Sequence, residues 1–193
     1  AGMSPAATTL RVIGVSAPGP FVAQVEARGI EHVGLRHSTR AMAPHHDLAG
    51  VAELHRTFRR LRPDIVHTHN PKPGWFGRPA ARTARVPVVV NTVHGLYALP
   101  GDPLAKRAVV YALERAAAAG TDAELVQNPE DVRTLASTLR VPRSKLVLLG
   151  NGIDLTRFGD REDAPQRRAA VRAELGVEDH DVVVCAVGRL VAE

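Results

Sequence analysis

Short apolar runs rich in valine, isoleucine and leucine recur along the chain, and a glycine, histidine or asparagine follows each of the main ones. These runs are residues 64–69, 88–93, 125–127, 146–149 and 182–187. Bounded apolar runs of this length predict β-strands, and their continuous character predicts burial on both faces of a sheet. Residues 10–16 and 30–35 are predicted to form two more strands near the start of the chain.

The clearest helical pattern lies before the run at 64–69, where apolar residues recur every three or four positions. They are Leu48, Val51, Leu54, Phe58 and Leu61. Asp47 is predicted to cap the start of this helix, and Pro63 lies just past its end. We expect this helix to pack its apolar side against the sheet.

Residues that favour helix ends predict further helices. These are a helix over 21–28 closed by Gly29, one capped by Asp102 and closed by Gly120, one capped by Asn128, and one over 164–175 capped by Asp163. Pro79 lies in a further helical stretch, and an interior proline removes a backbone hydrogen bond. We therefore expect that helix to begin late.

Strands alternating with helices predict an α/β fold. Parallel neighbours need a long return path, so the pattern indicates right-handed crossovers and a Rossmann-like, doubly wound, mostly parallel sheet covered on both faces. In such sheets ligands bind just outside the carboxyl ends of the strands. The polar residues that follow the apolar runs are therefore the first candidates for a functional site.

Composition narrows the class of protein. The chain has 193 residues, 45% of them hydrophobic, which is typical of a globular protein with one substantial core. No apolar run reaches the ~20 residues of a bilayer helix, and residues 1–9 lack the pattern of a signal peptide, so we expect a cytosolic protein. The single Cys185 is expected to be buried and inert. The net charge of +5 favours an anionic partner.

Two groups of histidines follow or lie within predicted strands. His94 follows one strand and precedes Gly95, which would let the backbone approach a ligand, so His94 is our first functional candidate; capping of the loop is the alternative. His67 and His69 share one face of another strand. We set a metal site aside because two ligands are too few for zinc.

Five segments, in order, resemble family 4 retaining glycosyltransferases of the branch that builds bacterial surface polysaccharides. They are VHTHNPKPG at 66–74, NTVHG at 91–95, VQNPEDVRTL at 126–135, LLGNGIDLTRF at 148–158 and VGRL at 187–190. The resemblance implies the GT-B architecture of two Rossmann-like domains, the first on the acceptor side and the second binding a nucleotide-sugar donor. It implies no bound cofactor, no metal requirement, and a UDP- or GDP-sugar as substrate.

The resemblance also assigns roles to individual residues. His94 would lie beside the donor sugar, as the catalytic candidate, and Gly188 and Arg189 would begin the donor-phosphate site. An arginine suits that site because its guanidinium stays charged and can grip phosphate oxygens. The expected acceptor or cleft residues are His69, Asn70, Lys72, Gly95, Asn128, Gly150, Asn151 and Gly152. Lys72 is placed in a proline-flanked loop, where it could meet an acceptor phosphate or a sugar hydroxyl.

The domain prediction has three parts. Residues 1–158 form the acceptor-side domain without its first strand, 159–178 a linker and helix, and 179–193 the first strand of a donor domain that continues beyond this sequence. The segment 159–163 marks the link because it begins with glycine and is charged at every later position. We expect the enzyme to transfer a hexosyl unit to a saccharide or lipid-linked acceptor, and the chain alone to be inactive.

Other functions remain as alternatives. A GT-B-fold sugar-nucleotide epimerase would need acid and base carboxylates after the strands, where histidine, asparagine and glycine stand instead. A non-catalytic anion-binding Rossmann module is the second alternative, but nucleic acid is disfavoured because only 4% of residues are aromatic. No G-x-G-x-x-G follows a strand, which disfavours a dinucleotide enzyme. Arg56, Arg59 and Arg60 could meet anionic lipid at the inner face of the membrane, or simply form a solvated face.

Overall fold

The structure is a computed structural model that describes residues 10–38, 44–69, 71–98, 101–158 and 163–186. The chain divides into two compact units, Ala1–Gly150 and Asn151–Glu193. Among the described residues no helix is both long enough and apolar enough to cross a membrane. The predicted domain boundaries at residues 158 and 178 remain predictions.

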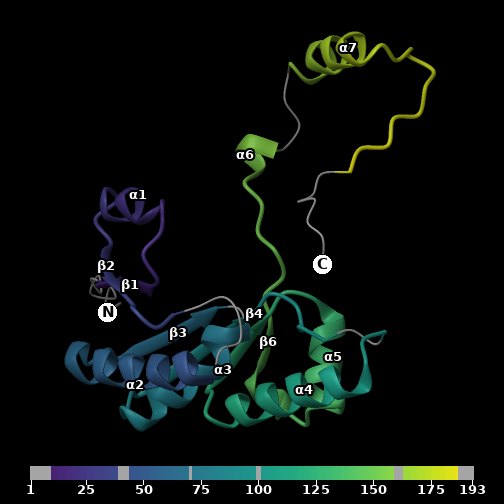
Figure 1. Ribbon diagram of the computed structural model, residues 1–193. Helices are drawn as coiled ribbons and strands as arrows, with labels where there is room; N and C mark the ends of the chain where they lie inside the picture. Colours follow the sequence, from purple (N-terminus) through teal and green to yellow (C-terminus); the bar gives the residue numbers. More distant parts are fainter. Residues whose placement is uncertain (1–9, 39–43, 70, 99–100, 159–162, 187–193) are drawn as a thin grey trace, which may run out of the picture. The chain divides into compact units, whose positions relative to one another are not determined.

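Unit 1 alternates strands and helices, as Figure 1 shows along the chain. Its elements are β1 (Ile13–Ser16), α1 (Val22–Glu26), β2 (Glu31–Gly34), α2 (Pro44–Leu61), β3 (Ile65–His69), α3 (Pro71–Thr83), β4 (Val88–Val93), α4 (Leu104–Ala119), β5 (Ala123–Val126), α5 (Pro129–Ser137), η1 (Arg143–Lys145) and β6 (Leu146–Leu148). β1 pairs with β2, and the second sheet has the order β3-β4-β5-β6, with every pairing parallel. The predicted α/β, Rossmann-like fold with a parallel sheet is confirmed.

The helix at α3 differs from the expectation of a late start, since it begins at Pro71 and continues through Pro79. A proline is tolerated in the first turn because the backbone N–H groups there have no partner within the helix. Two glycines bring α3 close to the sheet. A Cβ atom on Gly74 would lie 3.0 Å from Asn91 Oδ1, and one on Gly77 would lie 2.9 Å from Thr68 Cγ2.

Several predicted helix ends need correction. Asp47 is not the N-cap of α2, because the helix already begins at Pro44; its buried carboxylate instead pairs with a lysine of α3. Asp102 does not cap α4 either, and it forms an ion pair with Lys106 one turn later. Asp163 stands at the N-cap of α7, yet its side chain makes no capping hydrogen bond. Asp163 instead lies 3.8 Å from Arg167 one turn later, so at all three places the carboxylate pairs with a cation and does not cap the backbone N–H.

The two faces of the four-stranded sheet differ in cover. Val66, Val89 and neighbouring residues of α2 and α3 form one buried cluster, and Val93 and Val126 join a second cluster with α4 and α5. Paired residues of parallel strands share a face, so the opposite face is the one that carries Ile65, Val88 and Val147. These three are 57%, 39% and 46% exposed. The sequence predicted that helices cover both faces of the sheet. In the described residues, no element covers the face at these three positions.

Unit 2 contains α6 (Leu155–Phe158) and α7 (Ala164–Leu175), of which α7 has the predicted bounds. The predicted strand at 182–187 is wrong as far as it is described: residues 182–186 form no strand, and Val182 and Val184 are 91% and 89% exposed. The expected burial of Cys185 is wrong as well, because its thiol is exposed. A strand needs a neighbour to bond with, and the described part of unit 2 offers none.

Candidate functional site

Polar residues collect where the strands of the larger sheet end. Because β3, β4, β5 and β6 are parallel, their carboxyl ends lie at one edge, which we call the carboxyl edge. His69 ends β3 and His94 follows β4, while Asn128 and Gly150 come shortly after β5 and β6. The topology therefore brings these predicted residues to the same edge of the sheet.

His69 and His94 are in direct contact there. His69 Nδ1 lies 3.1 Å from His94 Nε2, and the two ring centroids are 5.4 Å apart. Both side chains are exposed, so a ligand could reach either ring. Gly95, directly after His94, has a φ of +129°, a conformation that side chains rarely adopt. This backbone geometry explains why a glycine follows the histidine.

A third imidazole completes the cluster. The His67 ring lies 4.1 Å from the His69 ring between centroids, and His67 Nε2 lies 2.7 Å from Thr92 Oγ1. Withdrawal of water lowers the pKa of His67 below its ordinary value, and the charge of His94 adds to this effect. The same loss of water lowers the pKa of His69, helped by the charges of His67 and His94. Both rings therefore favour the neutral form near pH 7.

No metal centre accompanies this cluster in the part of the chain that the structure describes. No group of three or more histidine, cysteine, aspartate or glutamate side chains there is arranged to hold a metal ion. Two surface cavities in the described residues lie away from the histidine cluster. One of about 360 Å³ lies where β3 and β4 begin, lined by residues such as Arg62 and Arg85, and one of about 420 Å³ lies within unit 2.

Lys72 does not lie in a loop as predicted. It belongs to the first turn of α3, its side chain is 16% exposed, and its Nζ lies 2.6 Å from Asp47 Oδ1 of α2. The ion pair holds the start of α3 against α2. A role for Lys72 toward an acceptor stays a prediction, and the pairing with Asp47 weighs against it, because part of its charge is already compensated.

Asn128 serves the fold directly. Its Oδ1 accepts a hydrogen bond from the Asp131 backbone N–H at 2.7 Å, and its Nδ2 donates to the Asp131 carboxylate at 2.6 Å. The predicted cap of α5 is thus confirmed, and a ligand role for Asn128 stays a prediction. Gly150 has a left-handed φ of +70° at the end of unit 1.

The remaining predicted site residues have less structural support. Asn151 and Gly152 begin unit 2, where both are exposed outside any helix or strand. Asn70, Gly188 and Arg189 lie outside the described residues. Their roles remain predictions.

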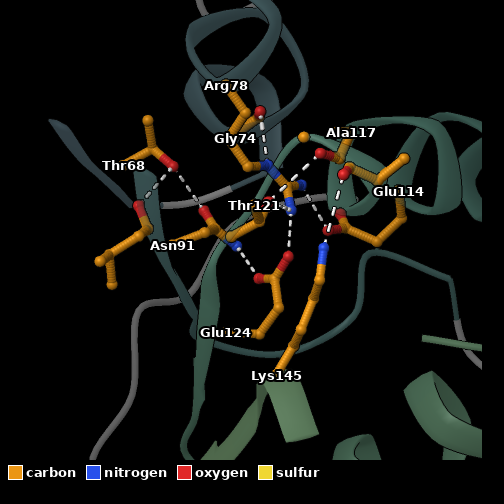
Figure 2. A network of polar contacts seen from close by, with 12 residues as sticks. Thr68, Gly74, Arg78, Asn91, Glu114, Ala117, Thr121, Glu124 and Lys145 are labelled. Carbon is orange, nitrogen blue, oxygen red and sulfur yellow. Dashed lines mark hydrogen bonds and ion pairs between the residues drawn. The ribbon is translucent and has the colours of Figure 1, made fainter. Parts of the chain in front are cut away.

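Sequence reasoning missed a buried polar network beneath the carboxyl edge, shown in Figure 2. The register sets Thr68, Asn91 and Glu124 side by side across β3, β4 and β5. Thr68 Oγ1 donates to Asn91 Oδ1 at 2.8 Å, and Asn91 Nδ2 donates to Glu124 Oε2 at 2.8 Å. The signal available in the sequence was the presence of Asn91 within the valine-rich β4, VVVNTV, and of Glu124 within β5, AELV.

Arg78 of α3 is the centre of this network, and it is fully buried. Its guanidinium donates to Glu124 Oε1 and to Glu114 Oε1, each at 2.5 Å, and to the Gly74 carbonyl at 2.8 Å. Trp75 Nε1 donates to the other oxygen of Glu114 at 2.8 Å. One arginine therefore faces two carboxylates. Burial raises the pKa of Glu124 above its ordinary value, against the opposing effects of Arg78 and of the hydrogen bond from Asn91.

The comparisons with known proteins agree with this architecture. A family model described as Glycosyltransferase Family 4 matches residues 7–157. The chain belongs to glycosyltransferase family 4. The resemblance carried by the five sequence segments is therefore confirmed, and the histidine cluster at the carboxyl edge belongs to a glycosyltransferase domain.

Two curated family 4 relatives illustrate the range of similarity. The chain is 34% identical over 145 residues to the Escherichia coli UDP-Gal:alpha-D-GlcNAc-diphosphoundecaprenol alpha-1,3-galactosyltransferase, with 75% of this chain and 36% of that protein covered. It is 30% identical over 183 residues to the D-inositol 3-phosphate glycosyltransferase of Nocardia farcinica, with 91% and 38% covered. The chain thus spans less than two fifths of the length of either relative.

A solved structure shows the same fold. HepE of Anabaena, crystallised in complex with UDP, aligns with a TM-score of 0.59 at 14% identity, covering 86% of this chain and 50% of that protein. The family 4 chain described here therefore shares its fold with HepE over the aligned part.

Proposed function

We propose that the complete enzyme containing this chain transfers a hexosyl unit from a nucleotide sugar to a saccharide or lipid-linked acceptor, with retention of the anomeric configuration. The observation that carries the proposal is the exposed His69–His94 pair at the carboxyl edge of a family 4 domain. The E. coli relative, named for a UDP-Gal donor and a diphosphoundecaprenol-linked acceptor, and the UDP complex of HepE support these substrate classes.

In this proposal His94 contacts the sugar of the donor. A neutral imidazole can accept a hydrogen bond from a hydroxyl through one nitrogen while its other nitrogen is held by protein. Gly188 and Arg189 would bind the donor diphosphate, because a guanidinium can stabilise the negative charge that develops as the leaving group departs. No bound cofactor or metal ion is part of this proposal.

The test is the substitution His94→Ala in the complete enzyme, assayed with a nucleotide sugar and an acceptor. Turnover is expected to fall about 100-fold, the lower range for loss of a positioned group, while the unfolding midpoint in urea stays close to that of wild type. His55→Ala is the control, because that side chain bonds Thr83 on α3 and lies away from the carboxyl edge. Unchanged turnover in His94→Ala would remove the histidine from the proposal.

Incubation of the complete enzyme with the nucleotide sugar alone tests the epimerase alternative. A glycosyltransferase is expected to leave the configuration of the free donor sugar unchanged and to form product only when acceptor is added. An epimerase would convert the donor without acceptor. The 193-residue chain by itself is expected to be inactive with both substrates, because it spans less than two fifths of the length of its relatives.

We further propose that α2 contacts an anionic membrane surface on the cytosolic side, where a lipid-linked acceptor would be found. Arg56, Arg59 and Arg60 of this helix are exposed, whereas Phe58 on its inner side is buried. Exposed arginines near a membrane gain about 1 kcal/mol each from anionic lipid. Sedimentation with vesicles containing phosphatidylserine should capture the enzyme at low salt and release it at high salt, and absence of binding at low salt would refute the contact.

A further inference from the structure

The contact between His69 and His94 joins two adjacent strands. The register pairs His69 of β3 with Thr92 of β4, and His94 follows two positions later, just past the end of β4. The two rings are inclined by 34°, with His69 Nδ1 at 3.1 Å from His94 Nε2. At this distance one proton lies between the two nitrogens, and it belongs to one ring or the other.

The second nitrogen of His94 is open. Within the described residues, His94 Nε2 faces His69 and no hydrogen bond involves His94 Nδ1. The favourable arrangement has Nε2–H on both rings, the tautomer that a free histidine side chain prefers. His94 Nε2–H then donates to the Nδ1 lone pair of His69, and the Nδ1 lone pair of His94 remains available to a ligand.

We propose that His69 is a positioning residue that accepts the Nε2–H of His94 and thereby fixes the tautomer and ring orientation with which His94 meets a sugar hydroxyl. Only the sugar hydroxyl rests on the proposed function; the pairing of the rings does not. A free imidazole would sample two tautomers and several orientations. Holding the His94 ring in one of them before the ligand arrives removes the entropic cost of ordering it on binding.

His67 restrains His69 in turn. The two rings lie 4.1 Å apart between centroids, tilted by 35°, and the 2.7 Å contact with Thr92 Oγ1 holds the His67 ring in place. Packing withdraws water from His69 and lowers its pKa, so that His69 stays neutral and keeps its lone pair near pH 7. A protonated His69 would have no lone pair at Nδ1 to accept the Nε2–H of His94.

The pairing can be tested by ¹⁵N NMR of histidine-labelled full chain at about pH 8, above the ordinary histidine pKa. In wild type, His94 is expected to show a protonated Nε2 and an unprotonated Nδ1. His69→Ala should produce a mixture of both tautomers. His69→Asn should restore the wild-type pattern, because the asparagine Oδ1 takes nearly the place of the histidine Nδ1.

His67→Phe is the matched control. It keeps an aromatic ring beside His69, and it removes the bond to Thr92 and the charge that His67 contributes to the lowered pKa of His69. Because His69 Nδ1 can still accept from His94 at about pH 8, the single tautomer of His94 should persist. If His94 keeps one tautomer in His69→Ala, or if wild type already shows a mixture, the pairing inferred here is refuted.

A kinetic experiment in the complete enzyme tests the positioning role. His69→Ala is expected to lower kcat about 10-fold, the smaller effect found when the hydrogen-bond partner of a working histidine is removed, and His69→Asn should recover most of it. Unchanged kcat in His69→Ala, together with a changed tautomer, would refute the role. Unchanged turnover in His94→Ala would refute the proposed function alone, because the NMR result on the pair stands independently.

Discussion

Successive residues of β3 and β4 meet two very different environments. Thr68 and Asn91 point toward α3, where they are buried and bonded to one another. His67 and His69, one position to either side of Thr68, are exposed on the opposite face. The same strands thus carry a closed polar network on one face and an open imidazole cluster on the other.

The difference teaches which polar groups a fold must satisfy. A buried polar atom without a partner costs about 1–3 kcal/mol, and a buried charge costs more, so every partner in the network around Arg78 is structurally required. On the imidazole face, water can reach the exposed side chains of His67 and His69. Ring nitrogens there can be left open for a ligand at little cost in stability, and function can use them.

The largest expected effect comes from Arg78→Met. This change leaves Glu114 and Glu124 buried without their cation, and removal of one partner of a buried ion pair costs about 3–5 kcal/mol. Urea unfolding of the full chain measures the loss. Arg82→Met, one turn along α3, is the comparison. It removes a partly exposed ion pair with Asp122, expected to contribute at most about 1 kcal/mol, together with hydrogen bonds to backbone carbonyls such as that of Gly120, and its loss should be the smaller one. Similar losses in the two variants would contradict the larger contribution expected from the buried ion pairs.

Asn91 and Thr92, neighbours in β4 that face opposite sides of the sheet, allow a second comparison, in which the expected losses of unfolding free energy are intermediate. Asn91→Ala removes the bridge between Thr68 and Glu124 and should cost about 1–3 kcal/mol of unfolding free energy. Thr92→Val removes the hydroxyl that faces His67, whose exposed ring can turn to water instead, and should cost less than about 1 kcal/mol. Denaturant midpoints of both variants test this order. A larger loss for Thr92→Val would mean that the imidazole face is structural.

The smallest effect is a pH dependence. The pKa of Glu124 is raised in the folded chain, so the folded state holds its proton to a higher pH than the unfolded state. The stability contributed by the protonated carboxyl is present at low pH and is lost as pH rises through the folded pKa. The stability of wild type minus that of Glu124→Gln should therefore fall as pH increases above about 4.5. Unfolding curves of both proteins at several pH values give this difference, and a flat or rising one would contradict the raised pKa.

Local patterns in the sequence predicted much of the fold. The runs at 64–69 and 88–93 became β3 and β4, and the Asn128 cap formed as expected. Val51, Leu54 and Phe58 of the apolar spacing pack against the core from α2, whereas Leu48 near the start of this helix is 74% exposed, against the prediction. The residues after the strands were correctly expected at one edge, because parallel strands share a direction. Such features depend on residues that are close in sequence, so the spacing of apolar residues along the chain is enough to predict them.

Contacts between distant residues could not be predicted in the same way. The link from Arg78 to Glu114 and Glu124 spans three elements, and Asp47 met Lys72 in place of the start of its own helix. The valine-rich segment at 182–186 does not form a strand in the described structure. A strand forms only where another strand can pair with its backbone groups, and a local pattern does not show whether such a neighbour is present.

The sequence by itself determined the order of strands and helices, the family and the residues at the carboxyl edge. Only the tertiary structure decided that His69 faces His94 and that Thr68 and Asn91, on the other face of the sheet, are buried and bonded to one another. The physical reason is register: alternation assigns each side chain to a face, but the pairing of two strands decides which side chains meet across them.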